Sequence, residues 1–184
     1  MSIKVNHRSW LLLGSLLAIS SVISVRAQVP PPQVPDILKV PNGHTVILKA
    51  LGKGVQIYEC KATAADPRKF DWSFTAPEAD LTNEKEEKIG KHYAGPTWEA
   101  NDGTKVIGEL PPKRADAPRP NAVPWLLLKA KTNEGTGKFA SVTYIQRVDT
   151  DGGLAPACGC DQAHVKTEVR VPYTANYYFY AAQR

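Results

Sequence analysis

The stretch VKTEVRV, residues 165–171, decides the fold class. Valine or threonine occupies its odd positions, and Lys166, Glu168 and Arg170 occupy the even ones. This alternation is typical of a β-strand with one face on the core and one in solvent, as in antiparallel sheets. We therefore predict a strand here, followed by an aromatic strand over residues 177–181 (YYFYA).

Further segments predict strands because they are short, rich in β-branched and aromatic residues, and bounded by Gly or Pro. They are residues 44–51, 55–62, 70–74, 104–110, 125–131 (with a helix as the alternative) and 138–148. The first two flank Gly52 and Gly54, which indicates a hairpin with its turn at the glycines. The sequence thus predicts an all-β fold, a single antiparallel sandwich or barrel with long Pro- and Gly-rich loops.

Two polar or proline-rich stretches separate predicted strands. Residues 82–88 (TNEKEEK) form the most charged run, which predicts a solvated loop, with one helical turn as the alternative. Residues 111–124 hold five prolines, so we expect a long loop without regular structure.

The first 27 residues have the features of a secretory signal peptide. Lys4 and Arg8 precede a mostly apolar stretch over residues 10–25. In Val25-Arg26-Ala27, Val25 and Ala27 are small residues at the two positions that signal peptidase recognises. The apolar stretch is shorter than the roughly 20 residues that a membrane span needs. We expect cleavage before Gln28, no membrane span in the mature chain, and a secreted or periplasmic protein.

Cleavage leaves residues 28–184, a length that suits one domain. Residues 28–35 are rich in proline and predict an extended leader, and residues 36–184 predict a single all-β domain. The signal peptide carries three Lys or Arg residues and no acidic residue, so its removal lowers the net charge from +5 to +2. No basic run interleaves with aromatic residues, and we expect no nucleic-acid partner.

Three cysteines remain, and two are expected to pair in an oxidising compartment. Cys158 and Cys160 are separated by Gly159 alone, which makes a bond between them awkward, so we favour Cys60–Cys160 with Cys158 free. That bond closes a loop of about 100 residues and contributes roughly 4–5 kcal/mol to stability. The alternative is a metal site of the three cysteines and His164, although the C-x-C spacing does not match the usual zinc patterns.

Residues 88–110 (KIGKHYAGPTWEANDGTKVIGEL) hold the densest set of titratable, aromatic and turn residues. Gly95-Pro96 and Asp102-Gly103 are turn signals. We expect the first turn to bring the residues on its two sides close enough to share a ligand. The predicted ligand-binding residues, including one from the strand at 125–131, are His92, Tyr93, Trp98, Glu99, Asp102 and Trp125.

A binding module is the function that these residues favour, because it needs stacking aromatics and a few polar groups. We expect a non-enzymatic domain for a small molecule or glycan, without a cofactor. In the alternative interpretation, the tryptophans and His92 are core residues. Asp102-Gly103 is then only a turn. A structural surface protein that acts through its proline-rich segments is another alternative.

An extracellular hydrolase is the enzymatic alternative. It would use a carboxylate pair drawn from Glu59, Glu99, Asp71 and Asp102. A triad of Ser141, His92 and Asp71 lacks the Gly-x-Ser-x-Gly elbow that would support it. The sequence therefore favours no particular catalytic residue.

Eight segments, in this order, resemble a known family. They are GVQIYEC (54–60), FDW (70–72), HYAGPTWE (92–99), DG (102–103), PWLL (124–127), VTYIQRV (142–148), CD (160–161) and PYTANYYFY (172–180). The family is a secreted one of bacteria and fungi catalogued as a domain of unknown function, DUF3455. The resemblance covers nearly all of the mature chain and implies no activity.

Some fungal members of that family carry the label malate dehydrogenase, which this sequence does not support. A dinucleotide fold needs Gly-x-Gly-x-x-Gly between a strand and a helix. The nearest match is Gly135, Gly137 and Ala140, and the residues after it, SVTYI, predict a strand. No helix N-terminus would then face a pyrophosphate.

Overall fold

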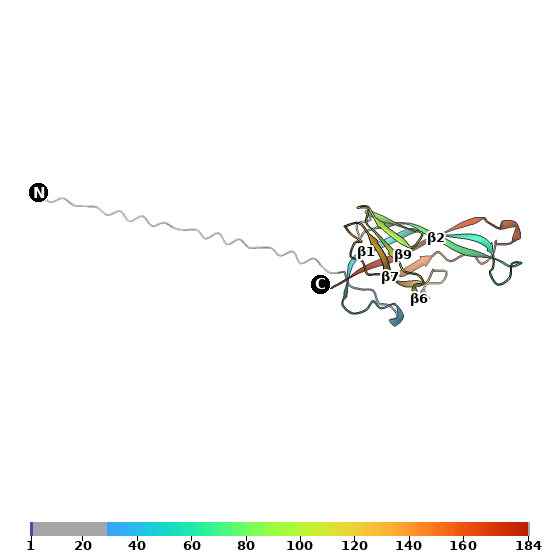
Figure 1. Cartoon of the computed structure of the whole chain (residues 1–184), viewed down its shortest axis with the longest axis horizontal. Coiled ribbons are helices and arrows are strands. Elements are labelled where there is room, and N and C mark those ends of the chain that lie inside the picture. The colour runs from blue at the N-terminus through green and yellow to red at the C-terminus, as the bar shows by residue number, and fades with distance from the viewer. Residues whose placement is uncertain (2–28, 184) are drawn as a thin grey trace.

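The computed structural model describes Met1 and residues 29–183 (Figure 1). Apart from Met1, the predicted signal peptide and its cleavage site lie outside the described residues. The described elements are the 3₁₀ helices η1 (Asp36–Leu38) and η2 (Gln162–His164) and the strands β1 (His44–Ala62), β2 (Phe70–Thr82), β3 (Lys88–Tyr93), β4 (Thr97–Ala100), β5 (Lys105–Gly108), β6 (Lys113–Ala115), β7 (Trp125–Glu134), β8 (Tyr144–Gly152) and β9 (Glu168–Ala182).

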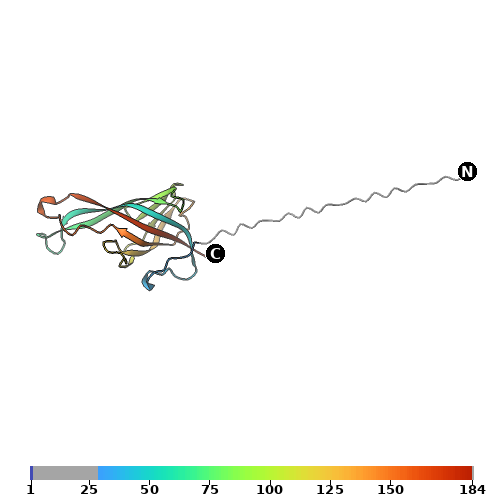
Figure 2. The same cartoon turned by 180° about the vertical axis from the view of Figure 1, so that it is seen from behind.

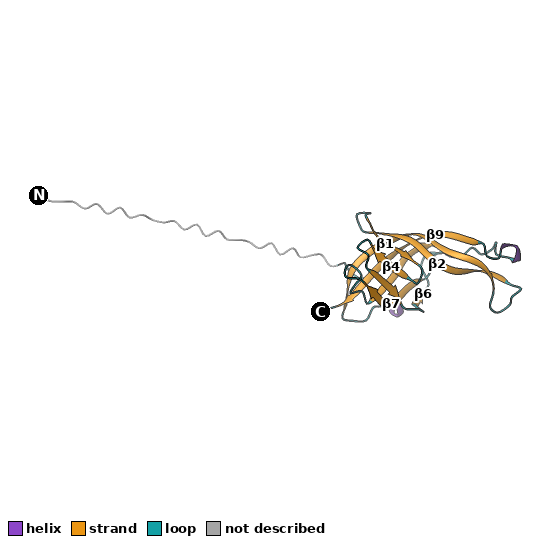
Figure 3. Ribbon diagram, turned by 45° about the horizontal axis from the view of Figure 1, so that its top comes forward, coloured by secondary structure: helices purple, strands orange, loops and turns teal. Residues whose placement is uncertain are grey.

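The strands form one antiparallel sheet whose two ends meet. Its order is β5-β4-β3-β2-β1-β9-β8-β7-β6, and β5 also pairs with β7. All strands but β6 therefore run round a ring, while β6 pairs with the first part of β7 (Figure 3). The predicted all-β antiparallel class is confirmed. Within residues 29–183 no helix is long and apolar enough to cross a membrane.

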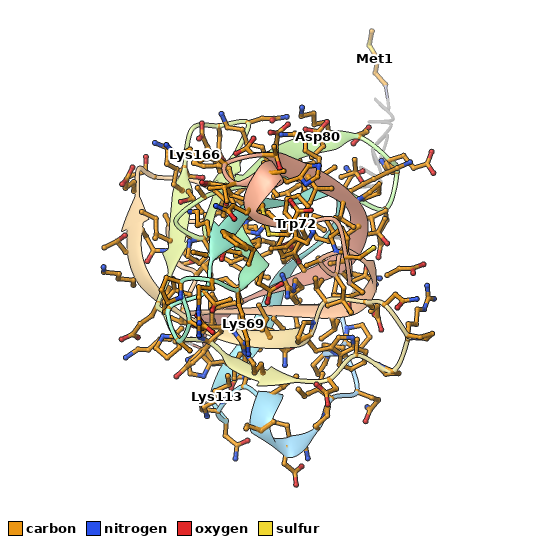
Figure 4. All side chains as sticks on the ribbon, turned by 90° about the vertical axis from the view of Figure 1, so that its right-hand side faces the viewer. Met1, Lys69, Trp72, Asp80, Lys113 and Lys166 are labelled. Carbon is orange, nitrogen blue, oxygen red and sulfur yellow. A yellow bond between two sulfur atoms is a disulfide. The ribbon has the colours of Figure 1, made fainter. Side chains whose placement is uncertain are left out.

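Three strands run on beyond the ring. The end of β1, the start of β2 and the start of β9 form an arm, with η2 near its tip (Figures 2 and 3). The Cys60–Cys160 disulfide joins β1 to the loop before η2, with a Cα–Cα distance of 5.3 Å. Cys158 is free and exposed. Its carbonyl accepts a hydrogen bond at 3.0 Å from Nε1 of Trp72, a side chain labelled in Figure 4. The predicted pairing is confirmed, and the disulfide removes two sulfurs from the alternative metal site.

The main core cluster lies inside the ring because alternate residues of each strand point inward. On β9 the inward residues are Tyr173, Ala175, Tyr177 and Phe179, each at most 3% exposed. The alternation predicted at residues 165–171 leads into this face, but the strand begins only at Glu168.

The start of β9 was predicted three residues too early. The Asp161 side chain caps η2 by accepting hydrogen bonds from the backbone N–H groups of Ala163 and His164. The Thr167 N–H then donates to His164 O at 3.0 Å, so the chain completes a turn before it enters the sheet.

The predicted hairpin at Gly52 and Gly54 is wrong, because β1 runs unbroken through both glycines. A Cβ on Gly52 would lie 2.5 Å from the ring of Tyr177, and one on Gly54 would lie 2.0 Å from Glu78 O. The two glycines therefore allow β1 to lie close to the Tyr177 ring and to the backbone of β2. Close approach of this kind is a known reason for glycine within a strand.

Two loop boundaries also differ from the prediction. Residues 111–124 are mostly irregular, as expected, but they include β6, which pairs with Trp125–Leu127 of β7. The strand predicted from residue 138 begins at Tyr144, because residues 138–141 form a turn that places Phe139 in the core. Residues 83–87 of the charged run form a loop between β2 and β3, as predicted, while Thr82 ends β2 and Lys88 begins β3.

A second apolar cluster lies on the outer surface of the ring. Val46, Val148, Tyr178 and Tyr180 form it, and Val29 and Val34 of the leader and Val40 after η1 pack against it. These segments meet because Leu38 of η1 is fully buried and its carbonyl accepts a hydrogen bond from Gln146 Nε2 at 2.6 Å.

Candidate functional site

A cavity of about 460 Å³ lies inside the ring, between the base of the arm and the β3–β4 turn. Its volume falls within the range of small-molecule sites. Its walls are largely apolar, and a few polar side chains reach into it. The lining residues used below are Gln56, Tyr58, Phe74, His92, Trp98, Leu110, Leu126, Arg147, Leu154 and Tyr177.

The mouth of the cavity has an apolar rim. Phe74, Leu110 and Leu154 line the cavity and are 54%, 64% and 42% exposed. Exposed large apolar side chains that gather round an opening are typical of a site that admits an apolar molecule.

The floor is built by the β3–β4 hairpin. Gly95 has φ +98°, a backbone conformation that glycine adopts without strain, and the Gly95-Pro96 turn puts His92 directly opposite Trp98. Their rings stack with centroids 4.3 Å apart and an interplanar angle of 9°. Tyr177 packs edge-on against both rings. The turn thus brings His92 and Trp98 together, in the way that the Gly-Pro signal predicts.

His92 is 3% exposed and uncharged in this setting. Burial lowers its pKa from 6.5 to about 3, although a hydrogen bond to Thr97 O at 2.8 Å acts in the opposite direction. A carbonyl oxygen only accepts, so Nδ1 carries the hydrogen and Nε2 carries a lone pair. His92 can therefore offer an acceptor to a ligand at neutral pH.

Two buried donors lie in residues of the cavity wall. Gln56 Nε2 and Trp98 Nε1 make no hydrogen bond of good geometry within residues 29–183, although the Gln56 amide lies close to the hydroxyl of Tyr173. Neighbouring side chains cover both nitrogens, so the cavity does not expose them.

Besides the exposed Arg114 of β6, Arg147 supplies the buried charge in the wall, and sequence analysis did not single it out. It is 9% exposed and lies on β8 between Tyr177 of β9 and Leu126 of β7. Its Nε and Nη2 donate to Pro124 O at 3.2 and 2.8 Å. An arginine inside the apolar run VTYIQRV was the available signal, since buried charges are rare without a partner.

The family of the chain follows from a comparison with family models. The model described as "Protein of unknown function (DUF3455)" matches residues 41–181, well over half of the chain. The chain belongs to the DUF3455 family. The matched span contains every cavity-lining residue of this DUF3455 domain. Comparisons with curated proteins and with solved structures give no match.

Two predicted site residues of the DUF3455 domain lie on the other face of the same hairpin. Tyr93 Oη donates to Glu99 Oε2 at 2.7 Å, and Lys91 Nζ lies 3.5 Å from the same oxygen. The hydrogen bond from Tyr93 is the main cause of a lowered pKa at Glu99, while burial and Glu99 raise the pKa of Tyr93 to about 12. Strand alternation thus separates this pair from His92 and Trp98.

The other two predicted residues serve structural contacts. Asp102 accepts hydrogen bonds from Thr104 Oγ1 and N and from Lys138 N, and these bonds lower its pKa to about 2. Trp125 packs against the outer cluster, with its Nε1 buried and unpaired within the described part of the chain. Of the six predicted residues, the cavity gathers His92 and Trp98.

The residues named for hydrolysis are spread over the DUF3455 domain. Glu59 forms an ion pair with Lys61 on the arm. The Asp71 carboxylate accepts a hydrogen bond from the backbone N–H of Trp72. Glu99 and Asp102 have lowered pKa values, whereas a general acid needs a raised one. His92 donates to Thr97 O, so its protonated nitrogen does not contact Ser141 or Asp71.

Proposed function

We propose that this domain is a non-enzymatic, exported module that binds one small, largely apolar molecule in the cavity of the ring. The observation that carries the proposal is the cavity itself, whose walls are largely apolar and include the buried guanidinium of Arg147. An acceptor group of a ligand would pair with that guanidinium, and the apolar part of the ligand would be removed from water.

Binding is favoured over catalysis by the state of His92. A general base works best when its pKa lies near the working pH, and the pKa of His92 is about 3. The imidazole of His92 also stacks on Trp98, which fixes the orientation of the imidazole. His92 is therefore better suited to orient a ligand than to move a proton.

Export is supported by two independent features. The first 27 residues have the charge and apolar pattern of a signal peptide, and the Cys60–Cys160 disulfide suits an oxidising compartment. Intact mass of the exported protein tests this proposal. A chain that starts at Gln28 is expected, and a retained N-terminus would contradict it.

Isothermal titration calorimetry tests the binding proposal on the mature protein with two probe pairs. The pairs are naphthoate with its neutral amide and decanoate with its neutral amide, all small enough for the cavity. We expect saturable binding of one molecule per chain. The variant Leu126→Trp fills the cavity from β7 and should remove that binding.

A matched pair of rim variants separates the cavity from general surface adsorption. Leu154 lines the mouth and Leu51 does not, yet each is 42% exposed. Leu154→Ser should weaken probe binding, while Leu51→Ser should leave it at the wild-type value. The proposal is wrong if none of the four probes saturates, or if Leu126→Trp binds them as wild type does.

A further inference from the structure

The guanidinium of Arg147 is a buried charge without a counter-charge. Within residues 29–183, no carboxylate lies within 4.0 Å of its nitrogens, whereas two surface arginines, Arg119 and Arg170, each have an acidic partner. Buried charges in proteins are normally paired, because removing an ion from water without compensation is costly. The charge of Arg147 therefore has no opposite charge beside it among the described residues.

The groups that face Arg147 are neutral. Burial raises the pKa of Tyr58, Tyr173 and Tyr177 and lowers that of His92, and the guanidinium of Arg147 has a smaller effect on each. No carboxylate contributes to the shift of any of these four groups. The inner end of the cavity thus holds a positive charge, surrounded by phenols and a neutral imidazole.

Arg147 keeps donors for a ligand. Arginine has five N–H donors, of which Pro124 O accepts from Nε and Nη2 and the Tyr177 hydroxyl lies close enough to accept from another. The remaining N–H groups line the cavity, whereas Gln56 Nε2 and Trp98 Nε1 are fully covered by their neighbours. A carboxylate suits such a set, since each of its oxygens accepts more than one hydrogen bond and arginine binds it through two parallel ones.

We propose that the ligand is an apolar carboxylic acid whose carboxylate pairs with Arg147 while its hydrocarbon part extends toward the rim at Phe74 and Leu154. This assignment rests on the proposed binding function and names the ligand class for it. The apolar walls account for the body of such a molecule, and the polar inner end accounts for its head group. A neutral apolar ligand would leave the guanidinium buried and unpaired.

The test compares each acid with its amide, which has nearly the same shape but no charge. Naphthoate should bind the wild-type protein about 10- to 100-fold more tightly than naphthamide, and decanoate should exceed decanamide likewise, as expected for hydrogen bonds to charged groups. Arg147→Met should remove most of the preference for the acids over the amides. Arg147→Lys, which keeps the charge without the fork, should retain part of the preference.

Arg119→Met is the matched control, because Arg119 is exposed, pairs with Asp151 and does not line the cavity. It should leave the preference for acids unchanged. If circular dichroism shows that Arg147→Met does not fold, the comparison of acid with amide in the wild-type protein still tests the carboxylate assignment. Equal binding of acid and amide, removed by Leu126→Trp, would overturn the carboxylate assignment and leave the binding proposal standing. Failure of all four probes would overturn both.

Discussion

His92 enters the core as a neutral ring because burial lowers its pKa from 6.5 to about 3. The unfolded chain binds a proton at this residue when the pH falls below about 6.5, whereas the folded chain does not. The contribution of His92 to stability is thus fully present above pH 6.5 and is lost as the pH falls toward 3.

We therefore expect acid to destabilise the wild-type protein more steeply than the variant His92→Gln. Between pH 6.5 and 4 the extra slope should approach about 1.4 kcal/mol per pH unit, the limit for one proton. Urea unfolding at a series of pH values measures it. His92→Gln is expected to be less stable at pH 7, since the stack on Trp98 is lost. Parallel pH profiles for the two proteins would contradict the prediction.

Single residues of the candidate site were only partly predictable from the sequence. The Gly95-Pro96 signal is local, so it correctly indicated that His92 and Trp98 lie together. It did not indicate that alternation would carry Tyr93 and Glu99 to the opposite face. The place of Arg147 depends on the register of β8 with β7 and β9, and that register is a property of the closed ring rather than of the local sequence.

β1 shows how tertiary structure overrides a turn signal. Gly52 and Gly54 look like a hairpin turn in the sequence, yet both lie in the interior of a 19-residue strand. Their function is to admit the ring of Tyr177 and the backbone at Glu78, neither of which is near in sequence. Strand content was predictable from composition and alternation, whereas strand continuity required knowledge of the neighbouring strands.

Gly54→Ala should destabilise the protein strongly, because its Cβ would lie 2.0 Å from the backbone oxygen of Glu78. Backbone cannot rotate away as a side chain does, so β1 and β2 must separate. We expect a loss of about 2–3 kcal/mol in the free energy of unfolding, typical of overpacking. Chemical denaturation measures it. Lys53→Ala, at the exposed neighbouring position, is the control and should change little; equal effects would refute the close-approach explanation.

The disulfide acts on the whole chain, because it joins residues 100 positions apart. Removing it with the double variant Cys60→Ser and Cys160→Ser should reduce stability by roughly 4–5 kcal/mol if chain entropy governs the effect. Thermal and urea unfolding measure the loss. Cys158→Ser provides the control, because that cysteine is free and exposed and should be dispensable. A large effect of Cys158→Ser would indicate that the pairing differs from the one described.

η1, which follows the leader, helps to cover the outer side of the molecule. Leu38 is fully buried and Ile37 beside it is 54% exposed, so the two form a matched pair. Leu38→Ala should destabilise the protein by about 2–5 kcal/mol, while Ile37→Ala should cost far less. Urea unfolding compares them. Because the outer cluster and the cavity lie on opposite faces of the sheet, Leu38→Ala should leave probe binding per folded molecule unchanged. A loss of binding would mean that the two faces are coupled through the strands.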